Sequence, residues 1–184
     1  MKIKETYDII IEKHPHYESL NKKLLQDADS IDYPLSHKTN VMGNHSEWRV
    51  ETENTLKIEK WILQVLYNEN PYLHSFRKDS FTHVRNGDLF FVRYNKGHYA
   101  VSHDHLPCIW SWSYYVKCPP GSSPLVFTTS GKRMNLKEGQ CIVFPSSIKH
   151  YVPKNNCDDR VVLVGNIECL LTNPSVLGGD PLDY

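Results

Sequence analysis

Short apolar segments alternate with turn-forming residues through the second half of the chain, and this pattern limits the fold more than any other feature. Glycine, proline, asparagine and serine mark turns at residues 95–97, 119–121 and 130–132. The apolar or aromatic runs around these turns cover residues 88–94, 109–117, 125–128, 140–144 and 160–167. Several short strands at this spacing are typical of a β-sandwich or barrel. We therefore expect a jelly-roll sandwich of about eight strands.

The first third of the chain predicts helices, because its apolar residues recur at intervals of three and four. One candidate helix covers residues 17–28 and a second covers 55–67, while the apolar residues 7–12 predict a strand. Residues 29–54 are polar and predict a loop. The helical spacing is carried by Leu20, Leu24 and Leu25, and then by Ile58, Trp61, Ile62, Val65 and Leu66. The expected fold class is α+β, with two N-terminal helices packed on the sandwich.

The length of the chain predicts a single domain. Its 184 residues match the common domain size of about 100–200 residues, and no stretch has the composition of a linker. Within this domain we expect residues 1–80 to form a helical support and 81–168 to form the β core. Residues 169–184 predict a loose tail.

Charge and targeting signals exclude several classes of protein. Lys and Arg together number 21, as do Asp and Glu, so the formal net charge is zero and a nucleic-acid partner is not expected. The sequence lacks an apolar run of about 18 residues, so we expect no transmembrane helix and no membrane partner. The N-terminal residues lack the apolar region of an export signal, and the five Cys form no Cys-x-x-Cys pair. We therefore expect a cytoplasmic protein with reduced thiols.

Histidine is unusually frequent, with 10 residues in the chain, and two of them share one candidate strand. His103 and His105 are separated by one residue. In a strand, residues i and i+2 project from the same face, which leaves Asp104 on the other face. Two imidazoles on one face can chelate a metal ion, since His is the commonest metal ligand. The alternative is a pair of surface histidines at a strand end.

A third histidine and an arginine follow further along the chain. His150 comes after the apolar run 140–144 and a proline bend, and Arg160 opens the apolar run 160–167. An arginine buried among apolar neighbours needs a polar partner, and its planar guanidinium suits a carboxylate through two parallel hydrogen bonds. The alternative for Arg160 is a surface ion pair with Asp158 or Asp159.

Several sequence blocks, taken in order, resemble the 2-oxoglutarate- and Fe(II)-dependent oxygenases. A His-x-His doublet, a distal His and an Arg ten residues beyond it are similar to the family's metal ligands and co-substrate anchor. The match is best to a short branch common in marine bacteria and phages, which is distantly similar to prolyl hydroxylases. Its other blocks resemble Gly97-His98-Tyr99, Ser113-Tyr114-Tyr115-Val116, Phe144-Pro145-Ser146 and residues 160–166. The resemblance covers about residues 85–168.

This resemblance implies a fold and a metal site. The implied fold is a double-stranded β-helix, which is a jelly roll of the cupin-like kind. The implied metal is Fe(II), bound by His103, His105 and His150. Arg160 matches the residue that binds the far carboxylate of the co-substrate 2-oxoglutarate. Two or three protein ligands leave open positions on iron for a bidentate 2-oxo acid and for O₂.

The resemblance also implies further residues in the co-substrate pocket. Tyr115 matches a tyrosine that, in related prolyl hydroxylases, donates a hydrogen bond to the same carboxylate. Tyr94 resembles another tyrosine that lines this pocket, and Asn166 shares a strand face with Arg160. Apart from the family match, Tyr94 and Tyr115 are more often core aromatic residues, and Asn166 could simply cap a sheet edge.

The third metal ligand departs from the family pattern. Most members have a carboxylate where this chain has His105, so a bound metal ion here keeps one more unit of positive charge. Imidazole nevertheless suits iron. Asp104 could take the place of His105 only if a β-bulge turned it inward. Strand parity therefore favours His105.

The implied reaction is hydroxylation of a substrate C–H bond by O₂, with 2-oxoglutarate converted to succinate and CO₂. The likeness to prolyl hydroxylases favours a peptidyl or prolyl substrate, and a small metabolite is the alternative. Residues 109–112 and the loop 40–48 are candidates for the substrate pocket, whereas Trp48 and Trp61 are expected in the core. If imidazoles bind the metal, affinity should fall as the pH drops through their ordinary titration range near 6.5.

Two other functions fit the same residues. A cupin-like three-His enzyme would not use 2-oxoglutarate, and Arg160 would then bind the carboxylate of the substrate itself. A non-catalytic β-sandwich binding module would leave the histidines inert. A homodimer through the sheet edges is compatible with the sequence, although no residue selects it.

Overall fold

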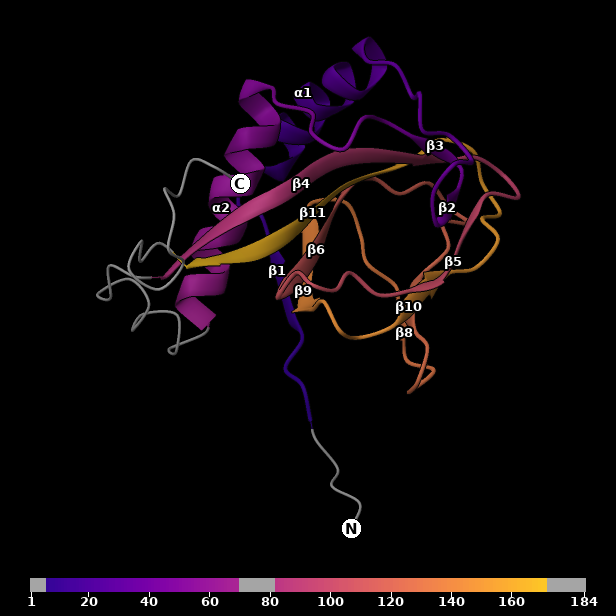
Figure 1. The fold of residues 1–184 in the computed structure, drawn as a ribbon. Coiled ribbons are helices and arrows are strands. Elements are labelled where there is room, and N and C mark those ends of the chain that lie inside the picture. The colour runs from indigo at the N-terminus through magenta and orange to yellow at the C-terminus, as the bar shows by residue number, and fades with distance from the viewer. Residues whose placement is uncertain (1–5, 70–81, 172–184) are drawn as a thin grey trace.

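The computed structural model describes residues 6–69 and 82–171 and contains two antiparallel sheets (Figure 1). The larger sheet has the order β1-β9-β6-β11-β4-β3, and the smaller has the order β2-β5-β10-β7-β8. The strands of the larger sheet are β1 (Ile10–Lys13), β3 (Asn44–His45), β4 (Thr82–Tyr94), β6 (Trp110–Lys117), β9 (Gln140–Pro145) and β11 (Arg160–Leu171). Those of the smaller sheet are β2 (Val41–Met42), β5 (Tyr99–His103), β7 (Leu125–Phe127), β8 (Arg133–Met134) and β10 (His150–Val152). The predicted sandwich is confirmed.

Successive side chains of β4 are buried on opposite faces of the larger sheet. Phe90 and Val92 belong to the core between the two sheets, whereas Leu89 and Phe91 belong to the core beneath the helices. Successive side chains of a strand project from opposite faces. A continuous apolar run therefore requires cover on both faces. The smaller sheet covers one face and the helices cover the other.

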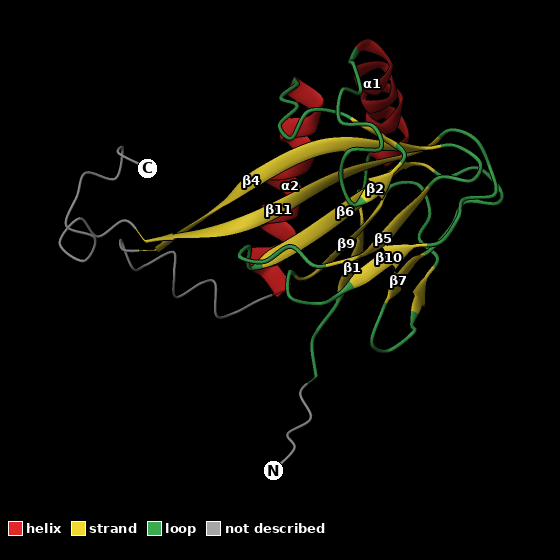
Figure 2. Cartoon of the chain, turned by 45° about the vertical axis from the view of Figure 1, so that its right-hand side comes forward, coloured by secondary structure: helices red, strands yellow, loops and turns green. Residues whose placement is uncertain are grey.

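The two helices, α1 (Tyr17–Ser30) and α2 (Glu53–Glu69), lie on the outer face of the larger sheet (Figure 2). Leu24, Ile58 and Ile62 are fully buried there, as their helical spacing predicts. The α+β fold class is thereby confirmed. Within the described ranges, no helix is long and apolar enough to cross a membrane.

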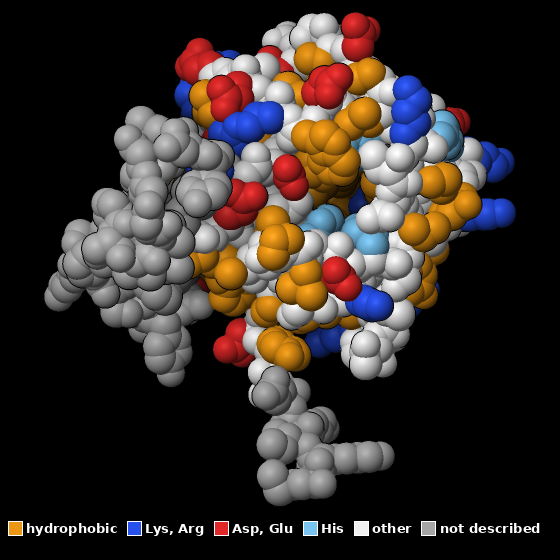
Figure 3. Space-filling model, in the orientation of Figure 1, with side chains coloured by type: hydrophobic (Ala, Val, Ile, Leu, Met, Phe, Trp, Pro, Cys, Tyr) orange, Lys and Arg blue, Asp and Glu red, His pale blue; other side chains and the backbone are white. Residues whose placement is uncertain are grey.

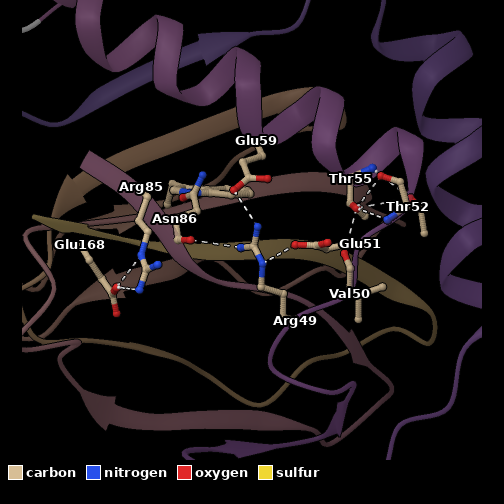
Figure 4. Close-up of polar contacts among 10 residues, drawn as sticks. Arg49, Val50, Glu51, Thr52, Thr55, Glu59, Arg85, Asn86 and Glu168 are labelled. Atoms are coloured by element: carbon tan, nitrogen blue, oxygen red, sulfur yellow. Dashed lines mark hydrogen bonds and ion pairs between the residues drawn. The ribbon is translucent and has the colours of Figure 1, made fainter. Parts of the chain in front are cut away.

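Side-chain contacts hold the segment that leads into α2 (Figure 4). The N–H of Thr55 donates to Thr52 Oγ1 at 3.1 Å, and the N–H of Thr52 donates to Thr55 Oγ1 at 2.8 Å. This reciprocal pair caps the helix in the manner of a capping box. Arg49 ties the same segment to the sheet through the carbonyl of Asn86 and to α2 through Glu59, each at 3.2 Å. The loop before α2 is thus fixed against the larger sheet.

The structure corrects the predicted ends of two strands. β4 begins at Thr82 rather than Asp88, and β11 continues to Leu171. These extensions pair with each other along their whole length. Polar residues in the first half of β4 hide the strand pattern in the sequence. Residues 169–171 are therefore strand rather than tail, and the rest of the predicted tail, 172–184, lies outside the described residues.

The predicted loop 29–54 contains structure that its sequence does not reveal. It includes β2 and β3, which pair with β5 and β4. The described residues form eleven strands, of which β2, β3 and β8 have two residues each. Strands this short show no periodicity, which is why about eight were expected. Trp48 is 47% exposed, so its predicted place in the core is wrong, whereas Trp61 packs against the core beneath the helices.

Candidate metal centre

Three imidazoles from separate segments converge at one end of the smaller sheet. His103 ends β5 and lies directly opposite His150, the first residue of β10, in the antiparallel pair. His105 follows two residues after β5. The ring centroids are 4.6 Å apart for His103 and His150, 4.8 Å for His103 and His105, and 5.1 Å for His105 and His150. One ligand atom from each residue lies within 4.8 Å of the others, so the three can hold a metal ion.

Backbone contacts fix the orientation of two of these rings. His103 Nδ1 lies 2.7 Å from the carbonyl of Val101, and His150 Nδ1 lies 3.0 Å from the carbonyl of Ile148. A carbonyl only accepts hydrogen bonds, so each Nδ1 must be the protonated, donating nitrogen. The lone pair of each ring is then on Nε2. This is the usual arrangement of a metal-binding histidine.

His105 reaches the cluster through a turn, not through strand alternation. β5 ends at His103, and the backbone N–H of His105 donates to the carbonyl of Ser146 at 2.9 Å. The carbonyl of His105 accepts from the N–H of Cys108 at 2.9 Å. Asp104 is not part of the cluster, and its Oδ1 accepts a long 3.5 Å hydrogen bond from the N–H of Leu106. The geometry groups His105 with the other two histidines.

Burial keeps the three imidazoles neutral. It lowers the pKa of His105 to about 3, and the nearby His150 and His103 add to the shift. Burial, followed by the charge of His103, lowers the pKa of His150 to about 4, and burial also lowers the pKa of His103. Neutral imidazole is the form that binds metal. Protons should therefore displace a metal from this cluster only at a lower pH than they would from exposed histidines.

Acidification should destabilise the metal-free protein below about pH 6.5. Unfolded histidines take up protons near that pH, whereas folded His105 and His150 do so only near about 3 and about 4. The unfolded state then binds more protons, so stability is complete above pH 6.5 and is lost as the pH falls towards the folded pKa values. Each pH unit of this range costs about 1.4 kcal/mol per imidazole.

Denaturant unfolding of the metal-free protein at pH 7.5 and pH 5 measures this loss. The H105N variant should lose less stability than the wild type over the same interval, because it lacks one of the buried imidazoles. The H16A variant is the matched control, since His16 is exposed and makes no side-chain capping bond at α1. An equal loss of stability in all three proteins would contradict the assignment of the shift to the buried cluster.

Arg160 is buried near the cluster with unpaired nitrogens. It is 2% exposed, and its guanidinium carbon lies 4.7 Å from the ring centre of Tyr94 and 5.4 Å from that of Tyr115. Arg160 Nε and Nη1 and Tyr115 Oη have no hydrogen-bond partner among the described residues. A buried charge without partners is costly, and these donors are free to bind an anion.

The alternative of a surface ion pair for Arg160 is wrong. Asp159 pairs with Lys117 and lies 3.3 Å from Arg93. Asp158 accepts the backbone N–H of Lys96 at 3.0 Å. Both carboxylates therefore have other partners, and the guanidinium of Arg160 points into the sandwich instead.

A cavity of about 50 Å³ joins the histidines to Arg160. At roughly 10–15 Å³ for each water, it holds about three to five waters, which is the space of a short-chain acid. Its wall includes Ser111, Ser113, Tyr94 and Tyr115, and none of the described residues that line it is Asp or Glu. The cavity therefore suits an anion that contacts the metal site at one end and Arg160 at the other.

Asn166 lies outside this cavity. It stands in β11, between β4 and β6, so it does not cap a sheet edge. Its Oδ1 accepts from Ser111 Oγ at 2.8 Å, and its Nδ2 donates to Asp88 Oδ2 at 2.7 Å. It lines a second, more open hollow of about 290 Å³ beside His103 and His105. Its part in binding the co-substrate stays a prediction.

Sequence reasoning did not single out Asp88 or His45, both of which line this second hollow. Asp88 lies on its wall, as does His45, which stacks on Phe90 at 4.4 Å between ring centres. Asp88 could have been found, because it is separated from Phe90 and Tyr94 by even numbers of residues and so shares their strand face. His45 belongs to β3, a two-residue strand that the sequence does not reveal. The loop 40–48 does line a pocket, as expected.

Comparisons with known proteins find similar structures but no similar sequences. No protein-family model and no curated protein sequence matches the chain. A viral collagen prolyl hydroxylase from Paramecium bursaria Chlorella virus 1, solved as its 2OG complex, is 14% identical with a TM-score of 0.65, over 86% of this chain and 94% of its own. A prolyl-4-hydroxylase from Pseudomonas putida is 16% identical with a TM-score of 0.62, over 89% of this chain and 93% of its own.

A third match has the same architecture. The prolyl hydroxylase from Trichoplax adhaerens, in complex with a peptide fragment of hypoxia-inducible factor, is 11% identical with a TM-score of 0.61, over 94% of this chain and 87% of its own. At such identities the likeness establishes the fold. The chain therefore has the double-stranded β-helix fold of the 2-oxoglutarate-dependent prolyl hydroxylases.

Proposed function

We propose that this chain is an Fe(II)- and 2-oxoglutarate-dependent dioxygenase that hydroxylates its substrate and releases succinate and CO₂. The observation that carries the proposal is the buried guanidinium of Arg160, whose Nε and Nη1 have no partner among the described residues, at the far end of the cavity that the three histidines share. A metal site alone fits many enzymes. A metal site joined by an acid-sized cavity to an unpaired arginine fits a dicarboxylate that contacts both.

The residues of the cluster fit an iron site. His103 and His150 present Nε2 because their Nδ1 atoms donate to backbone carbonyls, and His105 supplies the third imidazole. When bound, Fe(II) supplies the activation of O₂ that a protein side chain cannot perform. The protein keeps the three imidazoles neutral and together before the metal arrives. This preorganisation limits the cost of ordering the ligands.

The residues at the other end of the cavity fit a carboxylate. Arg160 Nε and Nη1 can donate to its oxygens, and the hydroxyl of Tyr115 can donate beside them. Burial raises the pKa of Tyr115 to about 12, although the charge of Arg160 opposes the shift. Tyr115 therefore keeps its proton and remains a donor. Apolar walls around these atoms exclude water and strengthen the contacts.

Charge also favours a dianionic co-substrate. Three neutral imidazoles leave both positive charges on a divalent metal, and Arg160 adds a third. In the part of the chain that the structure describes, the cavity wall has no carboxylate to balance them. A dicarboxylate such as 2-oxoglutarate neutralises two of the three charges. A cupin-like enzyme that does not use 2-oxoglutarate, with Arg160 holding its substrate, remains the second candidate because it too would fill this cavity with a carboxylate.

We also propose that the substrate is a prolyl or other peptidyl group, with a small metabolite as the alternative. The support is the fold, which the chain shares with hydroxylases named for prolyl substrates. The larger hollow beside the histidines is open to solvent, as a site for a chain segment should be.

The free cysteines of the described residues fit a reducing, cytoplasmic setting.

Succinate release tests the proposed function. With Fe(II), ascorbate and 2-oxoglutarate, the protein should release one succinate for each 2-oxoglutarate consumed, slowly alone and faster with an accepted substrate. A protein that binds metal but neither binds nor consumes 2-oxoglutarate would support the cupin-like alternative. A protein that binds no metal would support the non-catalytic binding module.

A further inference from the structure

The open hollow beside the metal centre has a chemical character of its own. It adjoins the inner cavity and shares His103, His105, Val41 and Phe90 with it. Histidine side chains lie at the bottom of a hollow on this face, with hydrophobic and acidic side chains around it (Figure 3). The hollow is more open than the inner cavity, which makes it the natural route for a substrate to the metal.

One wall of the hollow is aromatic. Trp48 is 47% exposed, and its ring lies 4.7 Å from that of His45 and 5.3 Å from that of Phe90, centre to centre. Leu106, which is 63% exposed, and Pro107 add a further apolar surface. A large aromatic ring held by neighbouring rings at the edge of a hollow can bind an apolar group or lie against a cation.

The charged residues that line the hollow are acidic. Asp88 and Asp104 are both half-buried there, and no Lys or Arg of residues 6–69 and 82–171 lines it. Among the described residues, neither carboxylate has an ion-pair partner. Asp88 accepts one hydrogen bond, from Asn166 Nδ2 at 2.7 Å, which fixes the direction of its carboxylate.

The nearby arginines do not neutralise these carboxylates. Arg49 pairs with Glu51 and Glu59, and Arg85 pairs with Glu168. A substrate that covered Asp88 with apolar atoms would bury a charge without a partner, which costs more than the contact returns. An anionic group would be repelled. A cationic group would complete the ion pair and could lie against Trp48.

We propose that this hollow, bounded by Trp48, Leu106, Asp88 and Asp104, binds a substrate that carries an ammonium or guanidinium group. The inference rests on the proposed function and adds a substrate class to it. Asp88 is the specificity residue, because Asn166 orients its carboxylate and it stands apart from the metal-binding imidazoles. The cation belongs either to a basic residue of a peptide or to a free basic amino acid, since both present the same chemistry.

Matched ligands that differ by one charge test the proposal. Arginine and citrulline have nearly the same shape, as do lysine and 2-aminoheptanoic acid, and each pair can be offered as the free amino acid or within a capped Gly-Pro-X-Gly peptide. Binding is measured by calorimetry on the protein loaded with Co(II) and 2-oxoglutarate. We expect the cationic member of at least one pair to bind about tenfold more tightly, which corresponds to about 1.4 kcal/mol.

Two variants locate the effect. D88N should reduce the preference to about threefold or less while leaving 2-oxoglutarate binding unchanged. D32N is the control, because Asp32 is an exposed carboxylate that lines neither hollow, and it should keep the preference. A preference confined to peptides identifies a peptide substrate, and one confined to amino acids identifies a metabolite.

Two results overturn the inference while leaving the proposed function in place. One is 2-oxoglutarate binding with no charge preference above about threefold in any pair. The other is a preference that D88N and the wild type share. Failure to bind 2-oxoglutarate at all instead contradicts the proposed function, so the two failures are distinguishable.

Discussion

Replacing Arg160 with leucine should weaken 2-oxoglutarate binding by about 30-fold or more while changing metal affinity by less than about threefold. The guanidinium is 2% exposed and has two unpaired nitrogens facing the cavity. Removing one partner of a buried, charge-assisted contact costs about 2–5 kcal/mol. The metal-binding imidazoles lie at the other end of the cavity. Calorimetry with Co(II), and then with 2-oxoglutarate on the Co(II)-loaded protein, separates the two affinities.

The ligand-free R160L protein should be at least as stable as the wild type. Leucine removes a buried charge that has no ion-pair partner in the described structure and fills much of the same space. R160K is the matched variant, since it keeps the charge but loses the planar pair of donors, and its affinity for 2-oxoglutarate should be intermediate. A parallel loss of metal binding and stability in R160L would indicate a folding defect and would contradict the assigned role.

Replacing His150 or His103 with alanine should weaken metal binding by about 100-fold or more. Loss of a mere supporting contact to a ligand already costs about 10- to 100-fold, and these residues offer ligand atoms themselves. His150 is also enclosed by the sandwich, so water can replace it only poorly. Co(II) titration followed by its visible absorption measures the loss, and H16A, an exposed histidine outside the cluster, should bind as the wild type does.

Three substitutions, H105D, H105A and D104N, decide the third ligand. H105D should retain metal binding and bind Co(II) more tightly than the wild type in the absence of 2-oxoglutarate, because it adds a negative charge next to the ion. D104N should leave metal binding nearly unchanged. If D104N instead loses the metal and H105A keeps it, Asp104 is the third ligand. The assignment of His105 as a ligand would then be wrong.

Strand alternation explains how much of the site the sequence could predict. Phe90, Val92 and Tyr94 share one face of β4, and that face does line the core between the sheets. The same rule predicted that His103 and His105 lie together. They do, but a turn after β5, and not strand alternation, brings His105 into place. Local periodicity is therefore a sound guide within a strand and only a partial one at its end.

Long-range pairing explains what the sequence could not show. The burial of Arg160 depends on Tyr94 and Tyr115, which β4 and β6 bring beside it across β11. Its unpaired nitrogens depend in turn on Asp159 being engaged by Lys117. The exposure of Trp48 depends on short strands without periodicity. Such features arise from contacts between residues far apart in the chain. Local patterns in a single sequence do not reveal these contacts.

A crystal structure of the protein with Co(II) and 2-oxoglutarate tests the central claim most directly. The account predicts one metal ion held by His103, His105 and His150, with the far carboxylate of 2-oxoglutarate on Arg160 and Tyr115. A metal that binds Asp104 in place of His105 would correct the ligand set. A 2-oxoglutarate carboxylate away from Arg160, or no metal among the three histidines, would contradict the account.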